Sequence, residues 1–214
     1  MKMKNLIILT TAISVILCLT SCSEKEINFD KAHLELVNRE IIATDEKEAG
    51  TLALNAKEGG GMAVIKNIDF DTGTIALALK GENNPGKSFI GIAFNIRNDS
   101  TYEAIYFRPF NFKSDKSASR EHSIQYISPP QYTWEFLRTR HEGVYEAAYP
   151  DPPSPDEWFE IKVKIDSNKV YVYDKESGTE LLNVNRLEKQ VSNKIGLWTG
   201  NNSKGTFKNM RVLK

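Results

Sequence analysis

Cysteine is nearly absent from this 214-residue chain, which contains only Cys18 and Cys22. Neither sign of charge is in excess, because Lys plus Arg and Asp plus Glu each number 28. Nucleic-acid-binding domains carry a basic surplus, so this balance argues against nucleic acid and other polyanions as partners. Hydrophobic residues at 40% and charged residues at 26% are ordinary globular values, which argues against a disordered chain and against a multi-span membrane protein.

The N-terminus carries an apolar run over residues 6–19, preceded by Lys2 and Lys4. The run is shorter than the ~20 residues that a membrane-spanning helix needs. A basic start followed by a short apolar stretch is typical of a secretory leader. We therefore predict a signal peptide over residues 1–21, the alternative being an anchor helix that is retained uncut.

The end of this leader, residues 19–22, reads Leu-Thr-Ser-Cys and resembles the lipobox of bacterial lipoproteins. The resemblance implies cleavage before Cys22, acylation of that residue, and a membrane partner through the lipid anchor. The expected location is the bacterial cell envelope, at the outer membrane, with the periplasmic and surface faces both open. The residues that follow, 23–26, read Ser-Glu-Lys-Glu and resemble the acidic export signal of surface lipoproteins.

Loss of the leader would also remove Cys18 and leave Cys22 as the single, lipidated cysteine. A chain with one blocked cysteine forms no intramolecular disulfide, no cysteine zinc site and no cysteine nucleophile. We expect residues 22–32 to be the lipidated cysteine and a tether, and residues 33–214 to be one domain.

Short segments with period-two alternation fill this domain and predict β-strands. In residues 74–80, Ile75, Leu77 and Leu79 share one face. Residues 159–165 alternate apolar with charged side chains, as a strand with one solvent-facing side does. The same reasoning predicts strands at 34–43, 51–54, 62–66, 89–96, 102–109, 122–127, 169–173, 194–199 and 205–213. About ten to twelve such strands at this spacing predict an all-β fold, a two-sheet antiparallel jelly-roll β-sandwich.

One long irregular stretch, residues 110–157, interrupts this pattern. It contains six prolines together with many aromatic residues. A loop-rich insertion of this length inside a domain is usually functional or disordered, and the aromatic residues argue against disorder. We therefore expect this insertion to contribute to a binding or active site.

Three stretches resemble the concanavalin A-like lectin/glucanase superfamily. They are residues 70–75 (FDTGTI), residues 158–163 with 169–173 (WFEIKV and KVYVY), and residues 194–198 with 205–212 (KIGLW and GTFKNMRV). Within the superfamily the resemblance is closest to the 3-keto-disaccharide hydrolase family. It implies a concanavalin A-like jelly roll and an oligo- or polysaccharide ligand. The Glu-x-Asp-x-x-Glu glucanase signature is absent, and retaining hydrolysis needs two carboxylates about 5 Å apart.

A candidate sugar site follows from the strand predicted at residues 102–109. If Ile105 and Phe107 face the core, then Tyr102, Tyr106 and Arg108 face the opposite side. The small residues Gly91 and Ala93 leave room on that side. Aromatic rings cover the apolar faces of sugars, and amide and guanidinium groups satisfy sugar hydroxyls. The predicted substrate-binding residues are Asn95, Tyr106, Arg108, Asn111, Arg120, Gln125, Tyr126, Trp134, Arg138 and Tyr145. For each of them a purely structural role in core or surface is the alternative.

The acid and base candidates in the same region are His122, Glu142 and Glu146. His122 is the cluster's only side chain that ordinarily titrates near neutral pH, although a hydrogen-bonded strand histidine is the alternative. Glu103 shares the face of Ile105, so we expect it to be buried and paired. No metal-binding motif occurs and we predict no metal or cofactor site, although calcium held by loop carbonyls would leave no motif.

Two functions remain open from the sequence. The first is an envelope-anchored enzyme that cleaves a glycosidic linkage, including that of a 3-keto sugar, with His122 and one of Glu142 or Glu146 moving protons. The second is a glycan-binding lipoprotein of the same fold without catalysis, with Tyr106, Arg108 and Trp134 as contacts. A structural envelope protein without a small ligand ranks third.

Overall fold

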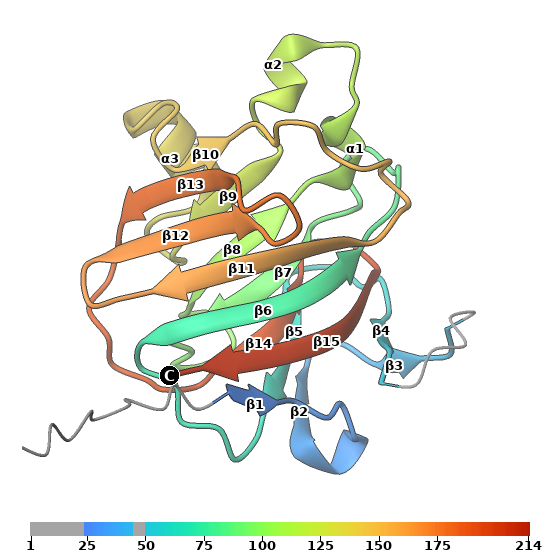
Figure 1. Cartoon of the computed structure of the whole chain (residues 1–214), viewed down its shortest axis with the longest axis vertical. Coiled ribbons are helices and arrows are strands. Elements are labelled where there is room, and N and C mark those ends of the chain that lie inside the picture. The colour runs from blue at the N-terminus through green and yellow to red at the C-terminus, as the bar shows by residue number, and fades with distance from the viewer. Residues whose placement is uncertain (1–23, 45–49) are drawn as a thin grey trace, which may run out of the picture.

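A computed structural model describes residues 24–44 and 50–214, and these fold into two antiparallel sheets packed face to face (Figure 1). The leader and the lipobox cysteine, Cys22, lie outside the described residues. Within the described part of the chain there are fifteen strands. This architecture confirms the predicted two-sheet β-sandwich.

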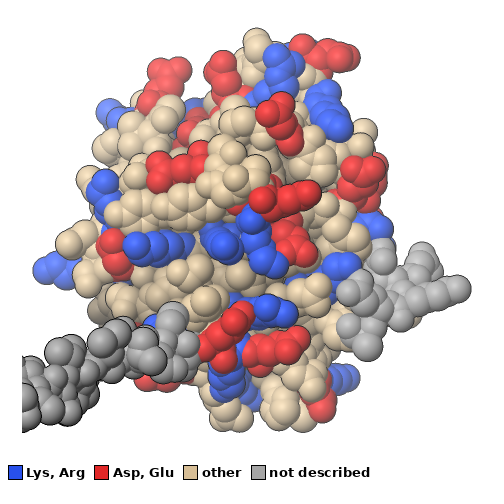
Figure 2. All heavy atoms as spheres, viewed as in Figure 1, with Lys and Arg blue, Asp and Glu red and all other residues tan. Residues whose placement is uncertain are grey.

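The eight-stranded sheet lies in front in Figure 1. From one edge to the other its strands are β13 (Glu180–Asn185), β12 (Lys169–Asp174), β11 (Phe159–Ile165), β6 (Gly73–Lys80), β15 (Gly205–Leu213), β4 (Leu52–Leu54) and β3 (Ile41–Ile42), and β1 (Glu24–Glu26) pairs with β15. Alternation along β11 buries Phe159, Ile161 and Val163 and exposes Lys162 and Lys164. The outer face of this sheet is therefore exposed to solvent, and positive and negative side chains are interspersed over it (Figure 2).

The seven-stranded sheet lies behind it and positions the site. Its order is β10 (Glu146–Ala147), β9 (Ile124–Ile127), β8 (Glu103–Phe107), β7 (Ile90–Phe94), β14 (Gly196–Thr199), β5 (Gly61–Ile65) and β2 (Leu34–Val37). Every residue of the five strands from β9 to β5 is buried, so both faces of this part of the sheet are covered. One face packs against the other sheet, and loops and short helices cover the second.

The insertion at 110–157 is more ordered than we predicted. It holds strands β9 and β10 and three short helices, α1 (Pro109–Phe112), α2 (Ser117–Arg120) and α3 (Trp134–Arg140), which lie at one end of the sandwich (Figure 1). None of these helices is long enough to show a helical period in the sequence. A 3-10 turn over Lys31–His33 precedes β2.

The single strand predicted at 34–43 is wrong. The chain forms β2 in one sheet, then adopts a left-handed conformation at Asn38 (φ 50°) and enters the other sheet as β3. Asparagine is one of the few residues that take this conformation readily, so it can turn the chain between sheets. The strand over Glu180–Asn185 was also missing from the prediction.

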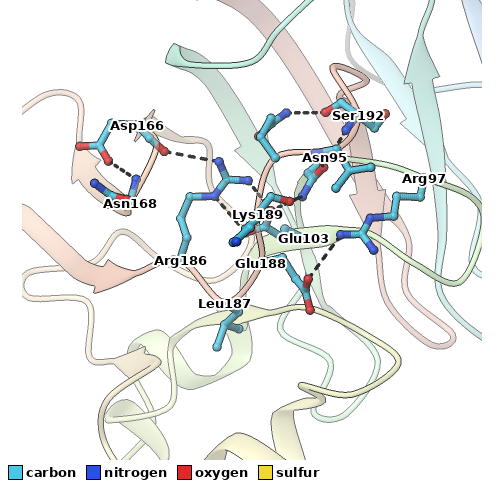
Figure 3. Close-up of polar contacts among 12 residues, drawn as sticks. Asn95, Arg97, Glu103, Asp166, Asn168, Arg186, Leu187, Glu188, Lys189 and Ser192 are labelled. Carbon is cyan, nitrogen blue, oxygen red and sulfur yellow. Dashed lines mark hydrogen bonds and ion pairs between the residues drawn. The ribbon is translucent and has the colours of Figure 1, made fainter.

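A buried ion pair lies between the sheets (Figure 3). Glu103 on β8 is fully buried and its carboxylate contacts the Arg186 guanidinium, which donates to both oxygens. Tyr126 donates its hydroxyl to Glu103, and Asn95 donates its side-chain amide to the same carboxylate at 2.7 Å. Burial alone would lower the pKa of Arg186, but the carboxylate of Glu103 raises it above its usual value. The expectation that Glu103 is buried and paired is confirmed.

Removal of this carboxylate should destabilise the fold strongly. Glu103→Ala leaves the Arg186 charge buried without its partner, and such changes cost about 3–5 kcal/mol of unfolding free energy. Urea denaturation measures the loss. Glu188→Ala is the matched control, because its pair with Arg97 is about one-third exposed at each end and is expected to contribute less than about 1 kcal/mol. Equal losses in the two variants would contradict a buried, structurally essential pair.

Candidate functional site

The second face of the seven-stranded sheet carries an aromatic floor. Tyr106 on β8 and Trp198 on β14 both pair in register with Gly91 on β7. The two rings lie 5.1 Å apart between centroids. Gly91 leaves no open space for a ligand, because a Cβ atom added there would lie 1.9 Å from the Ile105 carbonyl oxygen of the neighbouring strand. Phe89 completes the floor, edge-on to Tyr106 at 5.9 Å.

A cavity of about 610 Å³ lies above this floor. Its walls come from the loops that end at β5, β7 and β15 and from the three helices of the insertion. The aromatic lining residues are Phe89, Tyr102, Tyr106, Phe110, Trp134 and Trp198. The lining residues with polar side chains are Arg108, Asn111, Ser119, His122, Arg138 and Asn201. The cavity therefore combines broad apolar surfaces with convergent hydrogen-bonding groups.

Arg108 lies at the base of the cavity and is only 5% exposed. Its guanidinium donates to the Tyr106 hydroxyl (2.8 Å), the Gln125 side-chain oxygen (3.3 Å) and the His122 carbonyl (2.8 Å). It also lies over the Tyr106 ring, 4.9 Å from the centroid. Burial and the nearby charge of Arg138 lower the pKa of Arg108.

Behind the cavity wall, Glu146 holds two lining residues in place. Its buried carboxylate receives a bidentate interaction from Arg138, at 2.7 Å from Nη2 and 3.1 Å from Nε. The Nδ1 atom of His122 lies 2.8 Å from Oε2 of Glu146, although this contact lacks the alignment of a hydrogen bond. A histidine whose Nδ1 faces a carboxylate keeps its Nε2 for another partner, which is the arrangement of an oriented base.

Helix α3 brings Trp134 and Arg138 to the same wall. Thr133 caps the helix by accepting from the Phe136 amide, and basic residues occupy the last turn, as helix ends favour. Positions 134 and 138 are four apart and therefore neighbours on the helix surface. The Arg138 guanidinium lies 5.1 Å from the centre of the Trp134 ring, and Trp134 is 47% exposed. Buried Leu137 holds the helix against the sheet.

The structure brings together many of the predicted site residues. Those that line the cavity are Tyr106, Arg108, Asn111, His122, Trp134 and Arg138. Two more, Gln125 and Glu146, lie directly behind it, hydrogen-bonded to Arg108 and Arg138 respectively. These eight residues come from β8, β9, β10, α1 and α3, from the junction between β8 and α1, which holds Arg108, and from the segment before β9.

Two other predicted site residues, Asn95 and Tyr126, lie on the core side of the seven-stranded sheet and not on the cavity side. Asn95 has a left-handed conformation (φ 49°), which breaks the alternation of β7. Its side chain accepts from the amides of Val191 and Ser192 and donates to Glu103, so it anchors the loop after β13 (Figure 3). Tyr126 is fully buried between the sheets, where burial and the charge of Glu103 raise its pKa well above the usual value.

Three further predicted residues do not line the cavity. Arg120 is exposed and donates to the Ser114 carbonyl. Glu142 is exposed in the turn after α3, away from the lining residues. Tyr145 contributes its backbone carbonyl to the Tyr126 amide and the Gln125 side chain, and its ring packs against Tyr126. The lining of this cavity therefore includes none of these three residues, and the roles predicted for them stay predictions.

Sequence reasoning gave no binding role to several lining residues, among them Phe89, Phe110, Trp198 and Asn201, and it placed Tyr102 on this face without including it in the site. A signal for Trp198 was present, because Ile195 and Leu197 face the core and alternation then sends residue 198 to the other face. Tyr102 precedes Glu103 and follows the same rule. Trp198 donates its indole N–H to the Tyr102 hydroxyl at 3.1 Å, which fixes both side chains.

The described residues contain no cluster of three or more His, Cys, Asp or Glu side chains placed to hold a metal ion. A search of the same residues for helices finds none with the length and apolar character needed to cross a membrane.

The sequence matches no protein-family profile, and no curated protein is significantly similar to it. Several solved structures share the fold. The carbohydrate-binding module CBM66 from Bacillus subtilis has a TM-score of 0.57 at 10% identity, covering 84% of this chain and 95% of the module. The kappa-carrageenase from Pseudoalteromonas carrageenovora, solved with an oligotetrasaccharide of kappa-carrageenan, has a TM-score of 0.57 at 11% identity, covering 94% and 99%. The VIP36 exoplasmic/lumenal domain in its Ca²⁺/Man3GlcNAc-bound form has a TM-score of 0.55 at 12% identity, covering 86% and 84%.

These likenesses define a class of fold. The chain is a two-sheet β-sandwich with the same fold as these three domains. At 10–12% identity they extend to the fold alone. The narrower resemblance to 3-keto-disaccharide hydrolases stays a prediction.

The buried phenol of Tyr106 should make stability fall at high pH. Burial raises the pKa of Tyr106 to about 12, against the attraction of Arg108. The folded state therefore holds this proton more tightly than the unfolded state, and stability present below pH 10 is lost as pH rises toward 12. For this one group the loss is about 1.4 kcal/mol at pH 11. Urea denaturation at pH 8 and pH 11 should show a smaller loss in Tyr106→Phe than in the wild type, and identical losses would contradict the raised pKa.

Proposed function

We propose that this protein binds a saccharide in the cavity on the second face of its seven-stranded sheet. The observation that carries the proposal is the lining itself, in which six aromatic rings meet guanidinium, amide and imidazole groups within one cavity. Rings cover the C–H faces of a pyranose, and the polar groups satisfy hydroxyls that are costly to bury unpaired. A mostly apolar concavity with a few convergent polar groups is the usual form of a small-ligand site.

The solved structures of the same fold support this proposal. One is a carbohydrate-binding module, and two were solved with bound sugars, an oligosaccharide of kappa-carrageenan and Man3GlcNAc. The sugars belong to those proteins. Their recurrence on this architecture, together with the aromatic cavity here, favours a glycan over other small ligands.

The cavity supports saccharide binding better than it supports hydrolysis of a glycosidic bond by a pair of carboxylates. Retaining and inverting glycosidases need two carboxyl groups that flank the scissile bond. The residues that line the cavity in the described part of the chain include neither Asp nor Glu. The carboxylate that contacts the lining residues Arg138 and His122, that of Glu146, lies behind the wall and is engaged by Arg138. A carboxylate bound in this way orients its neighbours better than it attacks a sugar.

Cleavage by a histidine base is the second candidate, and the contact between His122 and Glu146 favours it. His122 lines the cavity while its Nδ1 lies 2.8 Å from the buried carboxylate. In this function His122 would take up a proton at Nε2 and Glu146 would stabilise the resulting cation. A 3-keto sugar would suit such a base, because the C3 carbonyl acidifies the C2–H. Loss of that proton to Nε2 would break the C1–O bond by elimination, and the departing sugar would take its proton from solvent.

Binding should depend on Trp134, which offers the most exposed ring of the cavity. Isothermal titration of the purified protein with a panel of disaccharides and their 3-keto derivatives, with and without Ca²⁺, identifies a ligand. Trp134→Ala should then weaken binding by about tenfold, the loss of roughly 1.4 kcal/mol expected for one aromatic contact. Trp158→Ala, at the residue just before β11 of the other sheet, is the control and should bind as the wild type does. Absence of binding to every sugar, or equal loss in both variants, would contradict the proposal.

The same panel separates binding from cleavage when released monosaccharide is followed by chromatography. Under the catalytic function His122→Ala abolishes release while its affinity stays nearly that of the wild type. Saturable binding without release from any sugar contradicts cleavage and leaves the binding function in place.

The proposed site of action is the bacterial cell envelope, with lipid on Cys22 as the membrane anchor. This part of the proposal is supported by residues 19–22 alone, Leu-Thr-Ser-Cys after a short apolar run. In cells fed labelled palmitate, the wild-type chain should incorporate label and enter the detergent phase of a Triton X-114 partition, and Cys22→Ala should do neither. Ser23→Ala is the control for a change beside the cleavage point. Equal labelling of Cys22→Ala and the wild type would contradict lipidation at this residue.

A further inference from the structure

The cavity that we propose for a saccharide has an unbalanced charge. Its lining includes two guanidinium groups, Arg108 and Arg138, and the imidazole of His122, whereas among the described residues it includes no Asp, Glu or Lys. Neutral sugars need no such imbalance, because hydroxyls are recognised equally well by amides and carboxylates. The excess of positive charge in the lining therefore indicates that the ligand carries a group other than its hydroxyls that this charge recognises.

The two arginines differ in how their charges are compensated. Arg138 makes a bidentate interaction with Glu146, so a carboxylate neutralises it. Arg108 is more deeply buried, at 5% exposure, yet all three of its hydrogen bonds go to neutral oxygens, those of Tyr106, Gln125 and the His122 backbone. Within the described residues no carboxylate lies at ion-pair distance from Arg108. Buried charges in proteins are normally paired, so this guanidinium lacks the partner that its burial calls for.

Arg108 is also placed to meet a ligand. It lines the cavity, and its three hydrogen bonds do not use all the N–H donors of a guanidinium. The Tyr106 ring, 4.9 Å away, and the Phe89 ring, 5.9 Å away, fix the plane of the group from the sheet side. A planar guanidinium held in one orientation matches the geometry of a carboxylate or sulfate oxygen pair.

Resting on the proposed function, we infer that the saccharide bound in this cavity carries an anionic group, a carboxylate as in a uronic acid or a sulfate ester, and that this group contacts Arg108. Glu146 attracts Arg108 without contacting it and is itself engaged by Arg138, so the bound anion supplies the direct contact that the described carboxylates do not. The balanced net charge of the chain does not oppose this inference, because it limits long-range attraction of polyanions whereas one buried guanidinium selects one anionic group at contact distance.

Matched pairs of trisaccharides test the inference on the wild-type protein. One set carries a single uronic acid of gluco, galacto or manno configuration and is compared with its methyl esters. A second set carries a single sulfate ester and is compared with the unsulfated parents. Calorimetry should show the charged member of at least one pair binding about 10- to 100-fold more tightly, as expected for a hydrogen bond to a charged group. That advantage should shrink with added salt, while the affinity of the neutral member should not change.

Variants then assign the preference to Arg108. Arg108→Gln should bring the charged and neutral members of the preferred pair to nearly equal affinity, and Arg108→Lys should retain part of the preference because the charge remains without the planar fork. Arg140→Gln, on an exposed residue of α3, is the control and should keep the full preference. If Arg108→Gln does not fold, as circular dichroism would show, the wild-type ester and sulfate comparisons still decide whether the cavity prefers an anionic saccharide.

The outcomes separate this inference from the proposed function. Equal affinity for both members of every pair overturns the anionic ligand and leaves saccharide binding standing. A preference that survives unchanged in folded Arg108→Gln overturns the role of Arg108. If no charged or neutral sugar binds at all, the proposed function itself fails and the inference fails with it.

Discussion

The ion pair between Glu103 and Arg186 is the interaction on which the geometry of the site depends. Both side chains are buried between the sheets, and a carboxylate can occupy that position only when a cation and hydrogen-bond donors surround it. Because side chains alternate along a β-strand, a shift of β8 by one residue would turn Glu103 to the other face of the sheet and leave the Arg186 charge buried without a partner. The pair therefore fixes the register in which Tyr106 and Arg108 face away from the core.

This register explains why one sheet has a solvated outer face and the other a covered one. In the eight-stranded sheet the outward positions of β11 carry lysines, which are stable in water. In the seven-stranded sheet the outward positions carry Tyr106, Trp198 and Met62, which need cover, and the loops and short helices supply it except over the cavity. The cavity is the part of this apolar sheet face that the loops and helices leave uncovered, and it is where we propose that the saccharide binds.

Much of the fold and part of the site could be predicted from alternation alone. Period-two patterns in 74–80 and 159–165 correctly placed two strands of the eight-stranded sheet, β6 and β11, and the parity of 102–109 separated Glu103 from Tyr106 and Arg108. Where alternation is interrupted, the prediction was wrong. The left-handed residues Asn38 and Asn95 each redirect the chain, and such conformations have no period to detect.

Two other failures have different physical origins. Gln125 and Tyr126 are adjacent in β9 and cannot both face the cavity, so the prediction of both disregarded the alternation used elsewhere. The helices of the insertion are held by tertiary contacts such as that of Leu137, and four to seven residues carry too little pattern to reveal a helix. Contacts between distant segments, such as His122 with Glu146, become visible only in three dimensions.

The central claim is that the cavity on the second face of the seven-stranded sheet is the saccharide site. A crystal structure of the protein with a bound oligosaccharide tests it most directly. The account predicts electron density for the sugar above the rings of Tyr106 and Trp198, within reach of Trp134. Density for the sugar only at another surface, such as the groove beside Trp158 on the opposite sheet, with the cavity left to solvent, would contradict it.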